Sequence, residues 1–186
     1  MSEVGLLRWA IDALEVGQVP YMICGSLASS VYGEARATND VDVVIDPTSE
    51  QLKRFLSSVP PTFYVSHEAA ASALAQRRMF NVIDPGTGGK IDLVIRKSRS
   101  FSIQELERRR RIPFSGKMAY FASPEDIILS KLEWASLGSS QRQVEDAAHV
   151  ARIQAKSLDV AYLRRWAGEL GVAATLETVL KFASDA

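Results

Sequence analysis

The sequence predicts an α/β protein, with a twisted mixed sheet and flanking helices in residues 1–122 and a helical C-terminal region in residues 123–186. Two observations favour this class. Short apolar runs alternate with helical patterns through the first two thirds of the chain, whereas only helical periodicity follows Ser123. A hydrophobic fraction of 47% over 186 residues also suffices for a real core.

The N-terminal elements follow from spacing and from chain breakers. Apolar residues at helical intervals predict a helix over 3–16, and the apolar run at 21–24 predicts the first strand. A short helix over 26–32 is expected to end at Gly33, and the run at 41–45 predicts the second strand.

The remaining elements are assigned in the same way. The turn-rich segment 84–89 separates two strand-like runs and predicts a hairpin connection. It does not match a phosphate-binding P-loop, because residue 84 is not glycine and Ile91 follows Lys90. The other expected helices are 49–57, 67–77, 103–111, 124–137, 141–155, 159–169 and 173–183, and the other expected strands are 63–65, 80–83, 91–95 and one or two within 112–121.

The most informative pattern is a pair of aspartates, Asp40 and Asp42, set among the apolar residues of the second expected strand. Because side chains alternate along a strand, both carboxylates are expected on the same face, a few ångströms apart. Carboxylates held so close repel each other unless a cation lies between them. The pair therefore indicates a divalent cation site.

Two further features point to phosphate chemistry. Gly25 and Ser26 follow the first strand directly and open a helix, which is a favourable place to bind phosphate. A third acid, Asp92, lies in the middle of the apolar run Ile91–Ile95, where acids are disfavoured. Each acid alone fits an exposed strand face, but the three together with Gly25-Ser26 favour a metal site.

At this point the chain resembles the DNA polymerase β-like nucleotidyltransferase superfamily. The pattern is an apolar-Gly-Ser segment, a gap of 13 residues, Asp40-Val-Asp42 and a later lone aspartate in a strand. More narrowly, the chain resembles the minimal nucleotidyltransferases of bacterial toxin–antitoxin and abortive-infection systems. That likeness rests on Gly25-Ser26-Leu-Ala28, Tyr32-Gly33, Arg36, Thr38-Asn-Asp40-Val-Asp42, Ser123-Pro-Glu125-Asp126, Lys131-Leu132, Arg142 and Glu145-Asp146.

The resemblance implies roles for these residues. Asp40, Asp42 and Asp92 are the expected catalytic ligands of Mg²⁺ or Mn²⁺, with Asp92 also helping to activate the acceptor hydroxyl. Gly25 and Ser26 are expected to bind the nucleoside triphosphate, for which ATP is the candidate. Ser26 replaces a glycine that is common in the family, and no motif is assigned after about residue 155.

Two cations have competing interpretations. Arg36 lies four residues before Asp40 and pairs either with phosphate or with a neighbouring acid. Lys131 falls on the apolar stripe of its helix, so its stem either extends out of the core to water or, as the resemblance implies, directs the ammonium to the nucleotide phosphates.

Other residues are less informative. The run Arg108–Arg111 either contacts a nucleic acid backbone or forms a helix face that is salt-bridged to Glu105 and Glu107. The lone histidines His67 and His149 are expected to be structural. Cys24, the one cysteine, is expected to be a buried thiol.

The resulting hypothesis is a cytoplasmic, metal-dependent nucleotidyltransferase that moves a nucleoside monophosphate from a nucleoside triphosphate to an acceptor. The expected acceptor is a tRNA, a protein or a small molecule, and the resemblance also suggests a component of a toxin–antitoxin pair. One alternative is an inactive binding or antitoxin module with the same fold, and another is a phosphohydrolase. The balanced charge, with 22 basic and 22 acidic residues, gives no global argument for nucleic acid. No apolar run reaches the roughly 20 residues of a membrane span.

Overall fold

A computed structural model of the chain describes residues 3–35 and 40–184, and it confirms the predicted α/β class. The strands are β1 (Tyr21–Cys24), β2 (Asp40–Ile45), β3 (Tyr64–Val65), β4 (Met79–Asp84), β5 (Gly89–Ile95), β6 (Arg110–Phe114) and β7 (Lys117–Phe121). The helices are α1 (Glu3–Val16), α2 (Gly25–Tyr32), α3 (Ser49–Ser57), α4 (His67–Gln76), α5 (Ser100–Glu107), α6 (Pro124–Gly138), α7 (Gln141–Gln154), α8 (Val160–Glu169) and α9 (Ala173–Ser184).

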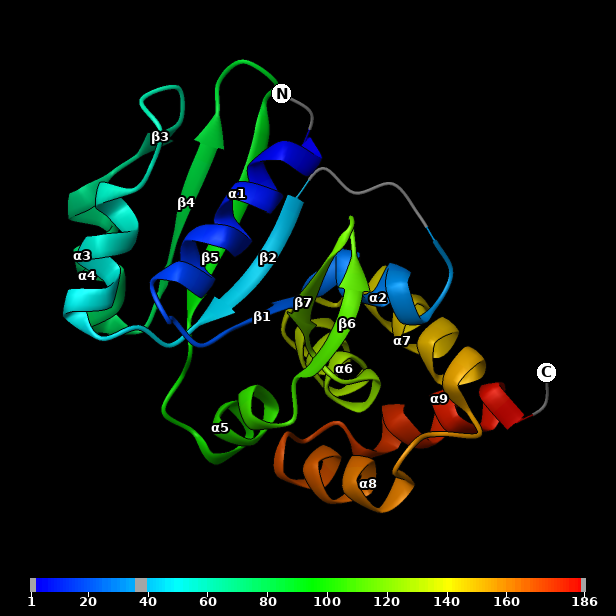
Figure 1. Cartoon of the computed structure of the whole chain (residues 1–186). Helices are drawn as coiled ribbons and strands as arrows, with labels where there is room; N and C mark the ends of the chain where they lie inside the picture. The colour runs from blue at the N-terminus through cyan, green and yellow to red at the C-terminus, as the bar shows by residue number, and fades with distance from the viewer. Residues whose placement is uncertain (1–2, 36–39, 185–186) are drawn as a thin grey trace. The chain divides into compact units, whose positions relative to one another are not determined.

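The described strands form one mixed sheet in the order β3-β4-β5-β2-β1-β7-β6 (Figure 1). β2 pairs in parallel with β5 and antiparallel with β1, which confirms that the strands containing Tyr21, Val41 and Ile91 are neighbours. Chain contacts divide the molecule into two compact units. The first holds the seven strands with α1, α3, α4 and α5, and the second holds α2 with α6–α9.

The first unit buries one face of the central strands. Val43, Leu93 and Phe80 lie side by side on β2, β5 and β4 and are at most 3% exposed. Helix α1 crosses the strands (Figure 1), and its Trp9 ring lies 5.6 Å from Phe55 of α3. Because side chains alternate along each strand, residues one position away lie on the opposite face, which carries the acids.

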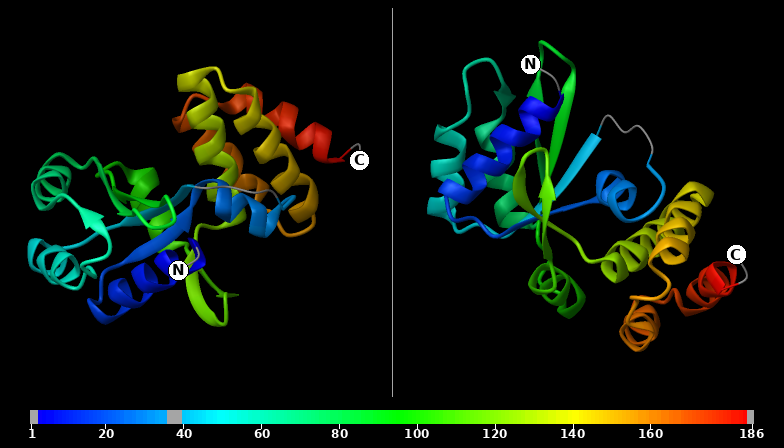
Figure 2. Two further views of the ribbon diagram at one scale, coloured as in Figure 1. Left: turned by 90° about the horizontal axis from the view of Figure 1, so that it is seen from above. Right: turned by 45° about the vertical axis from the view of Figure 1, so that its right-hand side comes forward.

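The second unit is helical. α6 and α7 lie side by side in antiparallel directions (Figure 2). α2 joins this unit by packing on α7, where Gln154 donates a hydrogen bond of 3.0 Å to the carbonyl of Tyr32. The predicted boundary at residue 122 leaves α2 with the sheet, whereas the contacts group it with the C-terminal helices.

The C-terminal end of one predicted helix is wrong. The expected helix 103–111 stops at Glu107, and β6 begins at Arg110. Pairing with β7 overrides the local helical pattern, and the guanidinium groups of Arg109 and Arg111 lie 4.7 and 5.6 Å from the ring centre of Tyr120. Arg110 and Arg111 therefore lie on a strand, and the helical conformation expected for the arginine run is wrong.

No helix in the described part of the chain combines the length and the hydropathy that a bilayer crossing requires.

Candidate functional site

The three aspartates of the predicted metal site lie on the same face of the sheet. Asp40 and Asp42 are two residues apart on β2, and Asp42 pairs directly with Asp92 in the parallel register of β2 and β5. Neighbouring strands lie about 4.8 Å apart, so the two carboxylates start from adjacent backbone positions. We call Asp40, Asp42 and Asp92 the carboxylate row.

Lys90 joins two members of this row. Its ammonium lies 3.0 Å from Oδ2 of Asp92 and 3.5 Å from Oδ1 of Asp40, so both acids lie within reach of one cation. The hydrogen bond to Asp92 raises the pKa of Lys90 above its ordinary value, and the charges of Asp92 and Asp40 act in the same direction. The amine therefore stays positively charged near neutral pH.

Asp92 is held on both oxygens. Asn81 of β4 donates a hydrogen bond of 3.0 Å to its Oδ1, while Lys90 donates to its Oδ2. The Asp92 residue is only 7% exposed, in contrast to the Asp40 side chain, which is 63% exposed. The carboxylate row thus runs from a fixed, buried acid to an open one.

The chemistry of the row fits a hard divalent cation, because its donors are carboxylate oxygens on neighbouring strands. Its present arrangement does not close around an ion. Within residues 3–35 and 40–184, no three or more His, Cys, Asp or Glu side chains are positioned to hold a metal. Lys90 contacts both Asp40 and Asp92 in this arrangement.

The predicted phosphate-binding residues open α2. Gly25 adopts a φ of 60°, a left-handed conformation that glycine accepts without a side-chain clash. The hydroxyls of Ser29 and Ser30 donate to the carbonyl of Ser26 at 2.9 and 3.0 Å. Arg36, the other predicted phosphate ligand on this segment, lies outside the described residues.

Lys131 has partners that the sequence did not predict. Its ammonium donates to Asp146 Oδ2 at 2.7 Å and to Gln143 Oε1 at 2.9 Å, both on α7. Its side chain is 5% exposed, so the alternative in which the stem carries the charge out to water is wrong. Its role toward nucleotide stays a prediction.

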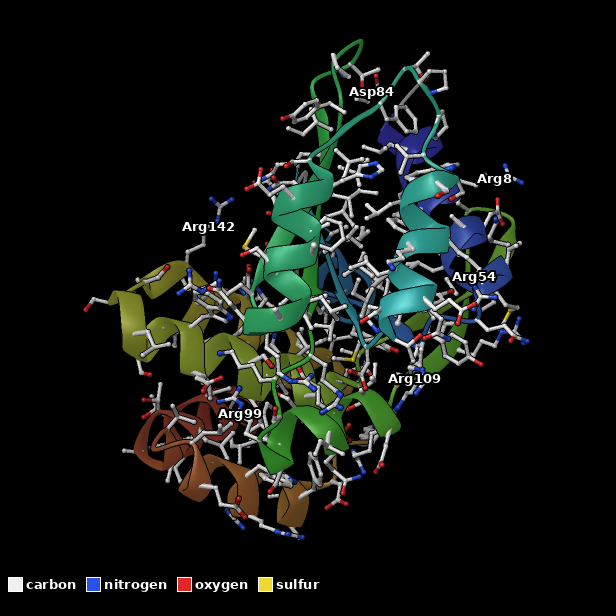
Figure 3. The ribbon with its side chains drawn as sticks, turned by 90° about the vertical axis from the view of Figure 1, so that its left-hand side faces the viewer. Arg8, Arg54, Asp84, Arg99, Arg109 and Arg142 are labelled. Carbon is white, nitrogen blue, oxygen red and sulfur yellow. The ribbon has the colours of Figure 1, made fainter. Side chains whose placement is uncertain are left out.

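The hairpin interpretation of segment 84–89 is confirmed. Asp84 accepts hydrogen bonds from the backbone of Gly86 at 2.9 Å and from the hydroxyl of Thr87 at 3.0 Å. It lies at the end of the β4–β5 hairpin (Figure 3).

Lys90, Asn81 and Cys24 were not predicted to belong to the site. Lys90 was detectable, because it stands two residues before Asp92 and therefore shares its strand face. Asn81 depends on the register of β4 against β5, which no local pattern gives. Cys24 pairs with Asp42 across β1 and β2 and is half-buried rather than buried, because it faces the same side as the row.

No protein-family model matches the chain, and no curated protein matches it in a sequence search. Solved structures do match. The crystal structure of ANT(2")-Ia in complex with adenylyl-2"-tobramycin superposes with a TM-score of 0.59 at 14% identity, covering 91% of this chain and 97% of that chain.

Two further structures agree. A nucleotidyltransferase-like protein from Paracoccidioides brasiliensis gives a TM-score of 0.55 at 17% identity, covering 94% of this chain and 91% of that one. The lincomycin-bound lincosamide antibiotic adenylyltransferase LnuA gives 0.50 at 13% identity, with coverages of 79% and 95%. These likenesses confirm that the chain has the nucleotidyltransferase fold.

Proposed function

We propose that this protein is a metal-dependent nucleotidyltransferase, which moves a nucleoside monophosphate from a nucleoside triphosphate such as ATP to an acceptor. The observation that carries the proposal is the pairing of Asp42 with Asp92, with Asp40 on the same face, in a chain with the nucleotidyltransferase fold. Acidic side chains are disfavoured in apolar strands, and metal binding for nucleotidyl transfer would account for three of them here.

Asp40, Asp42 and Asp92 would hold Mg²⁺ or Mn²⁺. When bound, such ions neutralise the charge that develops on the transferring phosphate. Asp92, fixed by Asn81, is suited to accept the proton of the acceptor hydroxyl, because its orientation is set before the substrate arrives.

The remaining assignments concern the nucleotide. The Gly25 backbone leaves room for a close approach of phosphate, and Ser26 offers a backbone N–H and a hydroxyl at the first turn of α2. Arg36 and Lys131 are assigned to the phosphates as well. For Lys131 this requires an exchange of its bond to Asp146 for one to phosphate.

The acceptor belongs to one of three classes: tRNA, a protein side chain or a small molecule. The structural neighbours favour a hydroxyl-bearing small molecule, because ANT(2")-Ia was solved with adenylylated tobramycin and LnuA with lincomycin. A place in a toxin–antitoxin pair is a further proposal that rests on the motif resemblance alone.

The test measures the release of pyrophosphate from each of the four nucleoside triphosphates, with and without Mg²⁺. The purified protein is incubated with a cell extract that supplies the acceptor. Release that needs both Mg²⁺ and Asp42 supports the proposal. A chain that binds nucleotide yet releases none with any acceptor fraction is the inactive binding module. Mass spectrometry of the extract then identifies which acceptor gains a nucleoside monophosphate.

A further inference from the structure

We propose that Lys90 is an internal counter-cation of the carboxylate row, which occupies part of the divalent-cation site and thereby sets the affinity of the row for the ion. The inference rests on the proposed function, since it assumes that the row binds a cation. Lys90 contacts Asp92 Oδ2 at 3.0 Å and Asp40 Oδ1 at 3.5 Å, on the face that the three acids share.

Both carboxylate oxygens of Asp92 already accept a hydrogen bond. Asn81 donates to Oδ1 of Asp92 and Lys90 donates to Oδ2, so a divalent cation that binds Asp92 either shares a carboxylate oxygen with one of these donors or displaces it. Displacing Asn81 would leave two cations beside one carboxylate. Displacing Lys90 removes that repulsion and also breaks its contact with Asp40.

Lys90 can make this movement at low cost. Its side chain is 33% exposed, so the ammonium can turn into water without burying a charge. Lys90 therefore stabilises the acids while the ion is absent and opposes the ion when it arrives. A cation bound together with a negatively charged triphosphate overcomes this opposition more easily than a cation alone.

The competing interpretation is an ordinary surface ion pair. A pair of that kind contributes little to stability, and its removal leaves neighbouring functions unchanged. The two interpretations differ in what happens to cation affinity when the charge of Lys90 is removed and the acids are retained.

The experiment is a titration of Mn²⁺ without nucleotide, with free Mn²⁺ measured by electron paramagnetic resonance. Lys90→Met keeps the length of the side chain and removes the charge, and we expect it to bind Mn²⁺ about tenfold more tightly than the wild type. Its melting temperature in EDTA should fall, because the acids lose their counter-charge. Lys97→Met removes an exposed charge two residues beyond the end of β5 and should match the wild type in both measurements.

Unchanged or weaker Mn²⁺ binding by folded Lys90→Met overturns the inference. If that variant fails to unfold cooperatively, Lys90→Gln carries the same expectation, because it keeps a hydrogen-bond donor without charge. Asp42→Asn separates this inference from the proposed function. If Asp42→Asn loses Mn²⁺ binding while Lys90→Met binds like the wild type, the metal site is supported and the role of Lys90 is contradicted. If neither the wild type nor Lys90→Met binds Mn²⁺, both proposals are contradicted.

Discussion

Asp42 of β2 and Asp92 of β5 are direct register partners in parallel strands, on the face opposite the buried residues Val43 and Leu93. This relationship explains how two apolar strands accommodate acids. Val43 and Leu93 face the core of the first unit, so alternation places both acids on the opposite face, where Asp92 is nonetheless only 7% exposed. Their common position brings like charges together, which costs free energy unless a cation offsets it.

Asp42→Asn is expected to abolish nucleotidyl transfer and to leave the fold intact. The amide keeps the shape of the side chain but removes one negative charge from the metal ligands. In the metal-free protein the melting temperature should stay equal or rise, because repulsion from Asp40 and Asp92 is relieved. Steady-state kinetics and thermal melts in EDTA measure both effects.

The control for this prediction is Glu107→Gln, an exposed acid at the end of α5 in the same unit. It removes the same charge and should retain full activity. An Asp42→Asn variant with wild-type turnover would show that the row does not hold the catalytic metal.

Much of the first unit could be predicted from local pattern. The alternation of apolar residues with Asp40, Asp42 and Asp92 placed the acids on one face, and the hairpin at Asp84 followed from its turn residues. The end of α5 could not be predicted in this way. Arg108–Arg111 carries a helical charge pattern, but Arg110 and Arg111 pair with β7, and Arg109 and Arg111 lie over the ring of Tyr120.

The pair Lys131–Asp146 provides a second prediction, which corrects the one that the sequence allows. From sequence alone, Lys131→Met is expected to change stability little. The structure shows a 2.7 Å ion pair with side chains only 5% and 11% exposed, so replacing the lysine takes a positive charge away from a nearly buried carboxylate. We expect a loss of about 3–5 kcal/mol in the free energy of unfolding, measured by urea denaturation.

Two companion variants sharpen this measurement. Lys131→Met with Asp146→Leu should recover part of the loss, because neither charge then stays buried. Lys156→Met, at an exposed position after α7, should change the free energy of unfolding by no more than about 0.5 kcal/mol. A loss for Lys131→Met within that same small range contradicts the buried-pair account.

The phosphate role of Lys131 is tested separately, at a temperature where the variant is folded. Loss of a charged hydrogen bond to phosphate should weaken binding of a non-hydrolysable nucleotide with Mg²⁺ by about 1.5–3 kcal/mol. Equal dissociation constants for Lys131→Met and the wild type would leave Lys131 with a structural role, which includes its hydrogen bonds to Asp146 and Gln143.

Gly33 fixes the approach of α2 to α7, and this gives a third prediction. A Cβ at Gly33 would lie 2.8 Å from the carbonyl oxygen of Ser29 and 3.1 Å from Cγ2 of Val150. Gly33→Ala should therefore lower the free energy of unfolding by about 1–3 kcal/mol, the usual cost of overpacking. Gly168→Ala is the control with the opposite sign, because α8 has open space there and alanine should stabilise the helix by about 0.4–1 kcal/mol. Equal effects of the two substitutions would contradict the packing argument.

Gly25 gives a fourth prediction. At a φ of 60°, an alanine costs about 1–2 kcal/mol, because its Cβ crowds the following carbonyl in the left-handed region. We expect Gly25→Ala to lower the melting temperature and to weaken nucleotide binding, since the side chain also fills space near the first turn of α2. Calorimetric titration with nucleotide measures the second effect, and unchanged affinity in a destabilised variant would remove Gly25 from the phosphate site.

The most direct test of the account follows one nucleoside triphosphate labelled separately at its α- and γ-phosphates, with Mg²⁺ and the acceptor fraction. Nucleotidyl transfer breaks the bond between the α- and β-phosphates. The account therefore predicts that the α label appears on the acceptor and the γ label in pyrophosphate, and that Asp42→Asn produces neither. Release of the γ label as orthophosphate, with no α label on any acceptor, would identify a phosphohydrolase and contradict the account.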